Sequence, residues 1–325
     1  MVPRINSVEI SNFKSLSHVQ VDLEPFTVFV GTNGSGKSNF IDALAFVQEC
    51  LAGSVEGALN RRGGWAHVMN RATDLASGPQ YPGIRFSLDI ELQSGIKAEY
   101  EFEIDTWVDH VSRSISIAYE SCVMQDSGGT ISEFRAERGK FTTSIPGIRP
   151  HLSPDNLAFR IVSGVEEFEP LWEFLVSMRF YDIHPGRLRE PQNPEAGLFL
   201  YPDGSNAASV LERIRSKKPA VIQRLTRFLS EACPGIRGVA RRPVGSKETL
   251  SFYQDIGLKE PEEFDALDMS DGTLRVLALL LSVLQPLPKV VGIEEPEASI
   301  HPALLEMIME ILMLESAGKQ VLITT

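Results

Sequence analysis

The sequence is poor in cysteine and has no long apolar run. Three cysteines occur in 325 residues, Cys50, Cys122 and Cys233, and their spacing matches neither a disulfide framework nor a metal site. Such cysteine usage is typical of a reducing compartment. No stretch of about 18 apolar residues is present, and the N-terminus lacks the apolar part of a signal peptide. These absences predict a cytoplasmic protein with no membrane partner.

Internal repeats, low-complexity tracts and sustained heptads are also absent, which excludes a repeat array and a coiled coil. The hydrophobic fraction of 43 % and the charged fraction of 23 % are ordinary for a globular chain. At 325 residues the chain is long enough for one large domain or two smaller ones.

Positive charge is scarce overall but is concentrated in one segment. The formal net charge of −12 argues against a surface coated for nucleic acid. From Leu211 to Leu250, however, ten Lys and Arg oppose three Glu, and from Ser251 onward four Lys and Arg oppose thirteen Asp and Glu. A basic segment before an acidic one indicates a binding function, although solvated helix faces commonly produce the same pattern. Two arginines beside an aromatic residue in Leu59–Trp65 similarly suit either a surface loop or a nucleic-acid contact.

Apolar residues follow strand periodicity in two ways. Short apolar runs without alternation predict strands buried on both faces, at Phe26–Val30, Lys289–Ile293 and Gln320–Thr325. Strict alternation predicts an antiparallel meander with one solvated face, over Ile84–Leu92, Glu99–Ile104 and Ile115–Tyr119, and two further strands near Ile5–Ile10 and Val19–Leu23.

Helical spacing separates these strands. It predicts helices at Ser38–Gly53, at Glu169–Met178, as a pair within Asp203–Cys233, at Ser270–Leu284 and at Pro302–Gly318. Ser205 or Asn206 is expected to cap the first helix of the pair, and Pro219 to open the second. The Gly- and Asn-rich stretch Asn60–Gly83 is expected to be a loop. Strands and helices thus alternate as in an α/β chain.

A phosphate-loop pattern, Gly31-x4-Gly36-Lys37-Ser38, lies between the first buried strand and the first helix. Its glycines let backbone N–H groups surround phosphates, and the helix N-terminus adds partial positive charge. Lys37 is expected to reach the β- and γ-phosphates, and the Ser38 hydroxyl to bind Mg²⁺.

An acidic pair follows the second buried strand. Glu294 is placed to hold Mg²⁺ directly or through water, and Glu295, which points the other way, can polarise an attacking water. A solvated acidic turn at a strand end is the alternative interpretation.

A second phosphate-binding pattern opens the most apolar helix. Met269–Arg275 places Ser270, Asp271 and Gly272 where helix N–H groups and a hydroxyl can bind phosphate. Two helix N-termini of one compact lobe cannot readily bind the same γ-phosphate. A second copy of the chain, arranged head to tail, is therefore expected to supply this helix to the nucleotide of the first. Taken alone, these residues also suit an ordinary N-cap.

Together these motifs resemble the ATPase head of ATP-binding-cassette proteins, in the RecF, SMC and overcoming-lysogenization-defect-type branch that includes uncharacterised AAA family ATPases. Asn12–Leu16, Phe180–Pro191 and Pro202–Leu211 also resemble that branch. The resemblance implies an α/β P-loop NTPase with a mostly parallel core sheet, an antiparallel β-lobe and a helical signature lobe. It implies one domain over 1–325, with a Walker A core and β-lobe (1–140), a helical insertion and signature lobe (141–280) and a Walker B and D-loop part (281–325).

The resemblance also assigns roles to individual residues. Nucleotide contacts are implied for Asn33, Gly34, Ser35, Gly36, Lys37, Ser38 and Asn39 of the Walker A loop, for Lys14, and for the signature residues Ser270, Asp271 and Gly272. Magnesium is expected at Ser38 and Glu294, and catalysis at Glu295 with Lys37. Ala298–His301 match the D-loop at the dimer seam. Glu294 stands where most such ATPases have Asp.

The implied activity is hydrolysis of ATP with Mg²⁺ between the two chains of a homodimer. Such a dimer would act as a switch in DNA repair or anti-phage defence, with a nuclease or another effector as partner and DNA or RNA as target. A transporter ATPase subunit and a non-hydrolysing nucleotide-dependent scaffold are the alternatives. Because the chain stops inside a predicted buried strand, before the histidine that follows it in the family, we expect a C-terminally truncated form whose hydrolysis is an open question.

Overall fold

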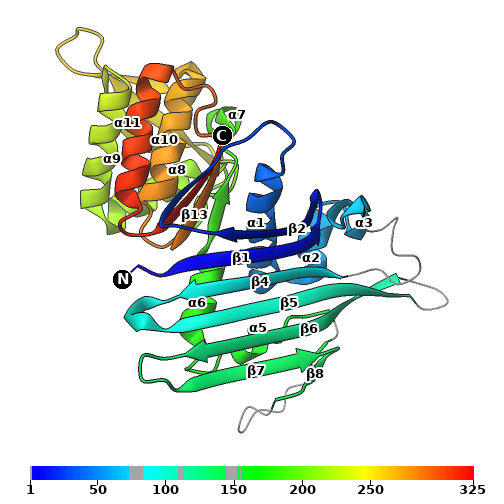
Figure 1. The fold of residues 1–325 in the computed structure, drawn as a ribbon. Coiled ribbons are helices and arrows are strands. Elements are labelled where there is room, and N and C mark those ends of the chain that lie inside the picture. The colour runs from blue at the N-terminus through cyan, green and yellow to red at the C-terminus, as the bar shows by residue number, and fades with distance from the viewer. Residues whose placement is uncertain (1, 73–82, 109–112, 144–151, 154) are drawn as a thin grey trace. The chain divides into compact units, whose positions relative to one another are not determined.

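The computed structural model describes residues 2–72, 83–108, 113–143, 152–153 and 155–325. The chain forms two compact units, one ending at Met178 and the other beginning at Arg179 (Figure 1). Each unit has its own hydrophobic core. Within the described ranges, no helix combines the length and the hydropathy that crossing a membrane requires.

The first unit contains a seven-stranded sheet that is antiparallel throughout. Its strand order is β2-β1-β4-β5-β6-β7-β8. The strands are β1 (Arg4–Phe13), β2 (Leu16–Asp22), β4 (Ile84–Glu91), β5 (Lys97–Val108), β6 (Arg113–Gln125), β7 (Ile131–Glu137) and β8 (Lys140–Phe141). In β4, buried side chains alternate with exposed or half-buried ones, so the predicted meander with one solvated face is confirmed.

Helices cover one face of this sheet (Figure 1). They are α1 (Lys37–Ala52), α2 (Val55–Arg61), α3 (Trp65–Val68), α5 (Phe159–Val162) and α6 (Glu169–Ser177). Aromatic rings join the two layers: Phe46 of α1 lies 5.5 Å from Phe13 of β1 and 5.6 Å from Phe86 of β4, between ring centroids. This packing fixes α1, whose N-terminus carries the phosphate-loop motif, onto the sheet. The short strand β3 (Phe26–Phe29) precedes that motif, and a single 3-10 turn, η1 (Gln93–Gly95), joins β4 to β5.

The second unit contains parallel strands. β13 (Val290–Glu294) pairs in parallel with β14 (Gln320–Thr324) and with β9 (Arg179–Tyr181). All of β14 and the first four residues of β13 are buried, as predicted for both. The helices are α7 (Pro185–Arg189), α8 (Ala207–Lys217), α9 (Pro219–Ala232), α10 (Asp271–Leu284) and α11 (Pro302–Glu315). A small antiparallel sheet consists of β10 (Ile236–Val244), β11 (Lys247–Gln254) and β12 (Glu262–Asp265), followed by the 3-10 turn η2 (Ala266–Asp268).

Several predictions of the fold need correction. The mostly parallel core sheet is not confirmed, because the largest sheet is antiparallel, and its strands β4 and β5 are joined by the short turn η1 rather than by a helical crossover. β3 is only partly buried, with Val28 37 % exposed, since an apolar run reveals composition and not what covers it. The predicted loop Asn60–Gly83 contains α3, and its residues 73–82 lie outside the described residues. The sheet β10–β12 was not predicted.

Candidate functional site

The phosphate-loop motif of the first unit lies between β3 and α1, and Gly36 is the N-cap of that helix. Gly34 and Gly36 have φ angles of 81° and 98°, in the left-handed region that favours glycine. A Cβ atom at Gly36 would also lie 3.1 Å from Leu16 Cδ2 and 3.3 Å from Ser15 Oγ. Local conformation and close packing therefore both require glycine at position 36.

Lys37 folds back over the loop that precedes it. Its Nζ donates hydrogen bonds to the backbone carbonyls of Gly31, at 2.6 Å, and of Thr32, at 3.1 Å. Ser38 is exposed in the first turn of α1. An ammonium group, free helix N–H groups and a hydroxyl therefore face solvent at one loop, where phosphate oxygens can take the place of the carbonyls.

The other predicted contacts of the loop fall into two groups. Asn33, Gly34 and Ser35 are exposed at its tip. Asn39 instead donates from Nδ2 to Ser15 Oγ, at 2.6 Å. That bond ties α1 to the segment that follows β1, so Asn39 has a structural role independent of any nucleotide.

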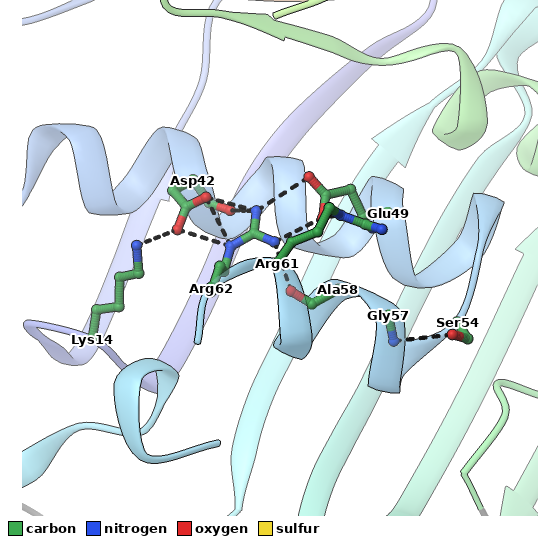
Figure 2. Close-up of polar contacts among 8 residues, drawn as sticks. All are labelled: Lys14, Asp42, Glu49, Ser54, Gly57, Ala58, Arg61 and Arg62. Atoms are coloured by element: carbon green, nitrogen blue, oxygen red, sulfur yellow. Dashed lines mark hydrogen bonds and ion pairs between the residues drawn. The ribbon is translucent and has the colours of Figure 1, made fainter. Parts of the chain in front are cut away.

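Lys14, another predicted nucleotide contact, is held by a carboxylate that the sequence analysis did not single out. Its Nζ lies 2.6 Å from Asp42 Oδ2 (Figure 2). Arg62 donates from Nη2 to Asp42 Oδ1 at 2.6 Å. Burial raises the pKa of the Asp42 carboxyl, but Arg62 and then Lys14 lower it by more, so its pKa lies below the ordinary value. Asp42 is therefore a stable anion beside the phosphate loop.

The same arginine also binds the next acidic residue on the same face of α1. Arg62 Nη1 lies 2.7 Å from Glu49 Oε2, and Arg61 Nε lies 2.8 Å from the same oxygen (Figure 2). The sequence does hold a signal for this arrangement. Asp42 and Glu49 are seven residues apart, so they share one helix face, and two arginines follow in the next helix.

The signature segment of the second unit forms a capped helix start. Ser270 is the N-cap of α10, and its Oγ accepts from the Thr273 N–H at 3.1 Å and lies 2.9 Å from Thr273 Oγ1. Asp271 pairs with Arg189 of α7, at 2.5 Å between Oδ1 and Nη1. The N-cap is confirmed, whereas the phosphate contact of these residues stays a prediction.

Gly272 lies against the predicted D-loop. A Cβ atom on it would be 3.0 Å from the Ser299 carbonyl oxygen. Residues Ser270–Thr273 and Ser299–His301 together line a hollow of about 670 Å³. The structure thus brings the signature and D-loop segments side by side within one unit.

Arg275 connects this helix to the predicted acidic pair. Its side chain is 5 % exposed; Nη2 donates to the Glu295 carbonyl at 2.5 Å, and Nη1 to the Ile183 carbonyl at 2.8 Å. Glu294 is half-buried at the end of β13, while Glu295 is exposed with a φ of 42°. In the sequence Arg275 is only the last residue of the signature motif, and this link was not predicted.

Magnesium would need ligands from outside the protein. Among the residues that the structure describes, no group of three or more His, Cys, Asp or Glu side chains is arranged to hold a metal ion. Protein-bound Mg²⁺ commonly uses one or two side-chain oxygens together with phosphate oxygens and water. The exposed Ser38 hydroxyl of the first unit and the half-buried Glu294 carboxylate of the second unit are each an oxygen donor of that kind.

The basic segment Leu211–Leu250 is partly neutralised within its own unit, where four of its ten basic residues form ion pairs. Its ion pairs are Arg224–Glu315, Arg237–Asp255, Arg241–Glu248 and Arg242–Asp265. The two arginines of Leu59–Trp65 are likewise paired with acidic residues of α1. The ion pairs of Arg61 and Arg62 favour the structural interpretation of Leu59–Trp65, whereas both interpretations stay open for the basic segment.

Comparison with known proteins identifies a family. The family model described as "AAA domain, putative AbiEii toxin, Type IV TA system" matches residues 26–325. Among curated proteins, the chromosome partition protein Smc of Methanocaldococcus jannaschii is 48 % identical over 44 residues, which are 13 % of this chain and 4 % of that protein. Structural maintenance of chromosomes protein 1 of Arabidopsis thaliana is 40 % identical over 57 residues, 17 % of this chain and 5 % of that protein. The matches thus span a small fraction of the length of these relatives.

Solved structures of SMC heads share the fold. The SmcHead bound to the C-winged helix domain of ScpA matches with a TM-score of 0.57 at 16 % identity, over 99 % of this chain and 89 % of that one. The Smc head domain with an extended coiled coil, bound to the C-terminal domain of ScpA and derived from Pyrococcus furiosus, matches with a TM-score of 0.50 at 14 % identity over the same shares. At such identities the likeness concerns the fold.

Proposed function

Because this chain belongs to that AAA-domain family and has the fold of an SMC head, we propose that it binds ATP with Mg²⁺ and hydrolyses it. The observation that carries this proposal is the phosphate loop. Gly34 and Gly36 have the left-handed conformation that such a loop needs, and Lys37 folds over it at the start of α1.

In this proposal a few side chains carry the chemistry. Lys37 and the first N–H groups of α1 bind the β- and γ-phosphates, and Ser38 and Glu294 hold the metal ion, which neutralises phosphate charge when bound. Glu295 accepts a proton from water as its oxygen attacks the γ-phosphorus and the bond to the β-phosphate oxygen breaks. Arg275, through the Glu295 carbonyl, positions this acidic pair.

We further propose that two chains close around the nucleotide, with Ser270 and Gly272 of each chain contacting the nucleotide of the other. The capped start of α10 and its contact with Ser299 of the D-loop support this arrangement, because both present backbone groups at one surface. ATP would then favour the closed pair and hydrolysis would reopen it, which makes the dimer a switch.

Two variants test catalysis. Lys37→Ala should weaken ATP binding at least about tenfold in calorimetric titration, because a charged phosphate contact is lost. Glu295→Gln should bind ATP as the parent protein does, but its rate of phosphate release should fall about a hundredfold or more, as expected for removal of a general base. Unchanged ATP affinity in Lys37→Ala would refute the site. Binding without turnover in the parent protein would favour a scaffold.

Dimerisation needs a separate measurement. With ATP present, light scattering of Glu295→Gln should give twice the monomer mass, and the added substitution Ser270→Arg should return it to the monomer mass. If the mass stayed at twice the monomer value despite Ser270→Arg, the signature helix would not lie at the dimer interface.

For the biological role we propose a switch that controls an effector, such as a nuclease, in DNA repair or anti-phage defence. The similarity to SMC heads supports an SMC-like role over that of a transporter subunit. The ScpA domains bound to the two similar heads support a contact with an effector protein in this chain. A test is to measure ATP turnover with and without DNA or RNA; turnover unaffected by either would remove nucleic acid from the proposal.

A further inference from the structure

The turn between β1 and β2 holds Lys14 in one backbone conformation. Asn12 and Lys14 have φ angles of 62° and 48°, which are uncommon for residues other than glycine. The Lys14 N–H donates to the Val68 carbonyl at 2.6 Å, and Asn12 Nδ2 donates to the Gly83 carbonyl at 2.9 Å. A strained conformation that surrounding contacts enforce is characteristic of functional sites. Here it fixes the direction in which the Lys14 side chain leaves the turn.

Asp42 is the acceptor for that side chain and serves a second cation as well. Asp42 Oδ2 lies 2.6 Å from Lys14 Nζ, and Oδ1 accepts from Arg62 Nε and Nη2 at 2.9 and 2.6 Å (Figure 2). The side chains of Lys14 and Asp42 are 29 % and 25 % exposed. The Lys14–Asp42 pair is therefore partly solvated and can open, since ion pairs of this kind are weak.

Arg62 is fixed independently of Lys14. Its side chain is 9 % exposed; Nη1 donates to Glu49 Oε2 at 2.7 Å and to the Ala58 carbonyl at 3.0 Å, and the guanidinium lies 5.2 Å from the Phe46 ring centroid. Lys14, by contrast, forms its one ion pair in the described residues with Asp42. If Lys14 leaves, Asp42 keeps the buried cation Arg62 as its partner, so the Asp42 carboxylate is never left without an ion-pair partner.

These residues adjoin the phosphate loop. Asp42 follows Lys37 by five residues on α1, which is about 7.5 Å along the helix axis. Ser15, next to Lys14, accepts from Asn39 in the first turn of α1 and approaches Gly36. A lysine side chain has a flexible four-carbon stem, so its ammonium can turn from Asp42 towards a phosphate bound at this loop.

We propose that Asp42 stores Lys14 while the loop is empty and that the polyphosphate of a nucleoside triphosphate draws Lys14 away from it. This inference rests on the proposed function, which places ATP at this loop. A triphosphate carries more negative charge than one carboxylate, so it attracts the ammonium more strongly once it is bound. Asp42 is then a positioning residue that sets ATP affinity through Lys14, and Arg62 keeps Asp42 paired in both states.

A double-mutant cycle on the full chain tests the storage of Lys14. Asp42→Asn should bind ATP·Mg roughly threefold to tenfold more tightly than the parent, because Lys14 no longer has to leave a partly exposed ion pair. In a Lys14→Met background the same change should have no effect. Glu49→Gln is the matched control: it also removes a partner of Arg62, does not contact Lys14, and should leave ATP affinity unchanged.

Each other result counts against the storage role. If the gain in ATP affinity persisted in the Lys14→Met background, or if Glu49→Gln gave an equal gain, the effect would come from a loosened Arg62. Weaker ATP binding by Asp42→Asn would mean that Asp42 only orients the site. In the parent protein, carboxyl-carbon NMR should show the pKa of Asp42 rising when ATP binds, and an unchanged pKa overturns the proposal without relying on a variant that might misfold.

The same titrations separate this inference from the proposed function. If Lys37→Ala abolishes ATP binding while Asp42→Asn changes nothing, the ATPase proposal stands and the storage role fails. If the parent protein binds no ATP, both fail.

Discussion

Three ionisable side chains that serve buried backbone groups differ in sign between the two units, and the one in the first unit is a carboxylate. Glu120 is fully buried and accepts from the Tyr100 hydroxyl at 3.0 Å, from the Phe159 N–H at 2.9 Å and from the Ala158 N–H. Burial outweighs these three donors and raises the pKa of Glu120 to about 7. The carboxylate thereby satisfies N–H groups at the start of α5.

The second unit uses cations. Arg275 donates to the Ile183 and Glu295 carbonyls, and Lys319 donates to the Gln285 carbonyl just after α10. Burial lowers the pKa of both cations, that of Lys319 to about 8. Helix starts leave N–H groups unpaired, whereas helix and strand ends leave carbonyls unpaired. At Glu120, Arg275 and Lys319 the sign of the buried charge therefore matches the kind of chain end beside it.

The largest expected effect is at Arg275. Arg275→Leu should lower the free energy of unfolding of the second unit by about 3–4 kcal/mol, because the carbonyls that it serves lose a buried donor. Hydrogen exchange measured on α10 reports this unit. Arg237→Leu is the control, since its ion pair with Asp255 is exposed and should contribute little to the free energy of unfolding. Similar losses in both variants would contradict the comparison.

The next effect is the pH dependence of the first unit. Because the pKa of Glu120 is raised in the folded state, its contribution is full below about 4.5 and falls as pH rises to about 7. The loss approaches about 3 kcal/mol. All three tryptophans lie in this unit, so fluorescence-monitored urea unfolding follows it alone. Glu120→Gln should flatten the profile of unfolding free energy against pH between these values. If the slope of that profile were unchanged in the variant, Glu120 would not be its cause.

The second unit should show the opposite slope at higher pH. The pKa of Lys319 is lowered from 10.5 to about 8, so stability should rise as pH increases through that interval, by somewhat less than about 3 kcal/mol. Lys319→Met should remove the rise, at the cost of the donor to the Gln285 carbonyl. Hydrogen exchange of β14 at pH values on both sides of the interval checks this, and a flat parent profile would contradict it.

The smallest effects compare two glycines. Gly36→Ala forces a left-handed alanine, which should destabilise the loop by about 1–2 kcal/mol and weaken ATP binding by a single chain. Gly272→Ala places a Cβ 3.0 Å from the Ser299 carbonyl and should leave that binding unchanged while weakening ATP-dependent association. Titration and light scattering separate the two. If Gly272→Ala weakened nucleotide binding instead, the signature helix would not act between chains.

Much of the local architecture could be predicted from sequence. The alternation at Ile84–Leu92 predicted β4, Ser270 predicted the start of α10, and Pro219 predicted the start of α9. These features depend on interactions between residues a few positions apart, so they are visible in a short stretch of sequence.

The partners of the charged residues could not be predicted in this way. Leu211–Leu250 is basic in sequence, yet three of its arginines, Arg224, Arg237 and Arg242, pair with acidic residues elsewhere in the second unit. Arg275 reads as a first-turn residue of a helix, yet it binds a carbonyl 92 positions away. The β10–β12 sheet was not predicted either, and Arg237, Arg241 and Arg242 interrupt the apolar pattern within β10.

By itself, the sequence determined where the backbone turns: the glycines at 34 and 36 and the cap at 270 impose conformations through their own covalent chemistry and their near neighbours. Only the tertiary structure decided which charges meet, such as Lys14 and Arg62 on Asp42, or Arg275 on the Glu295 carbonyl. The reason is that electrostatic interactions depend on distance and burial, and folding sets both without regard to separation along the chain.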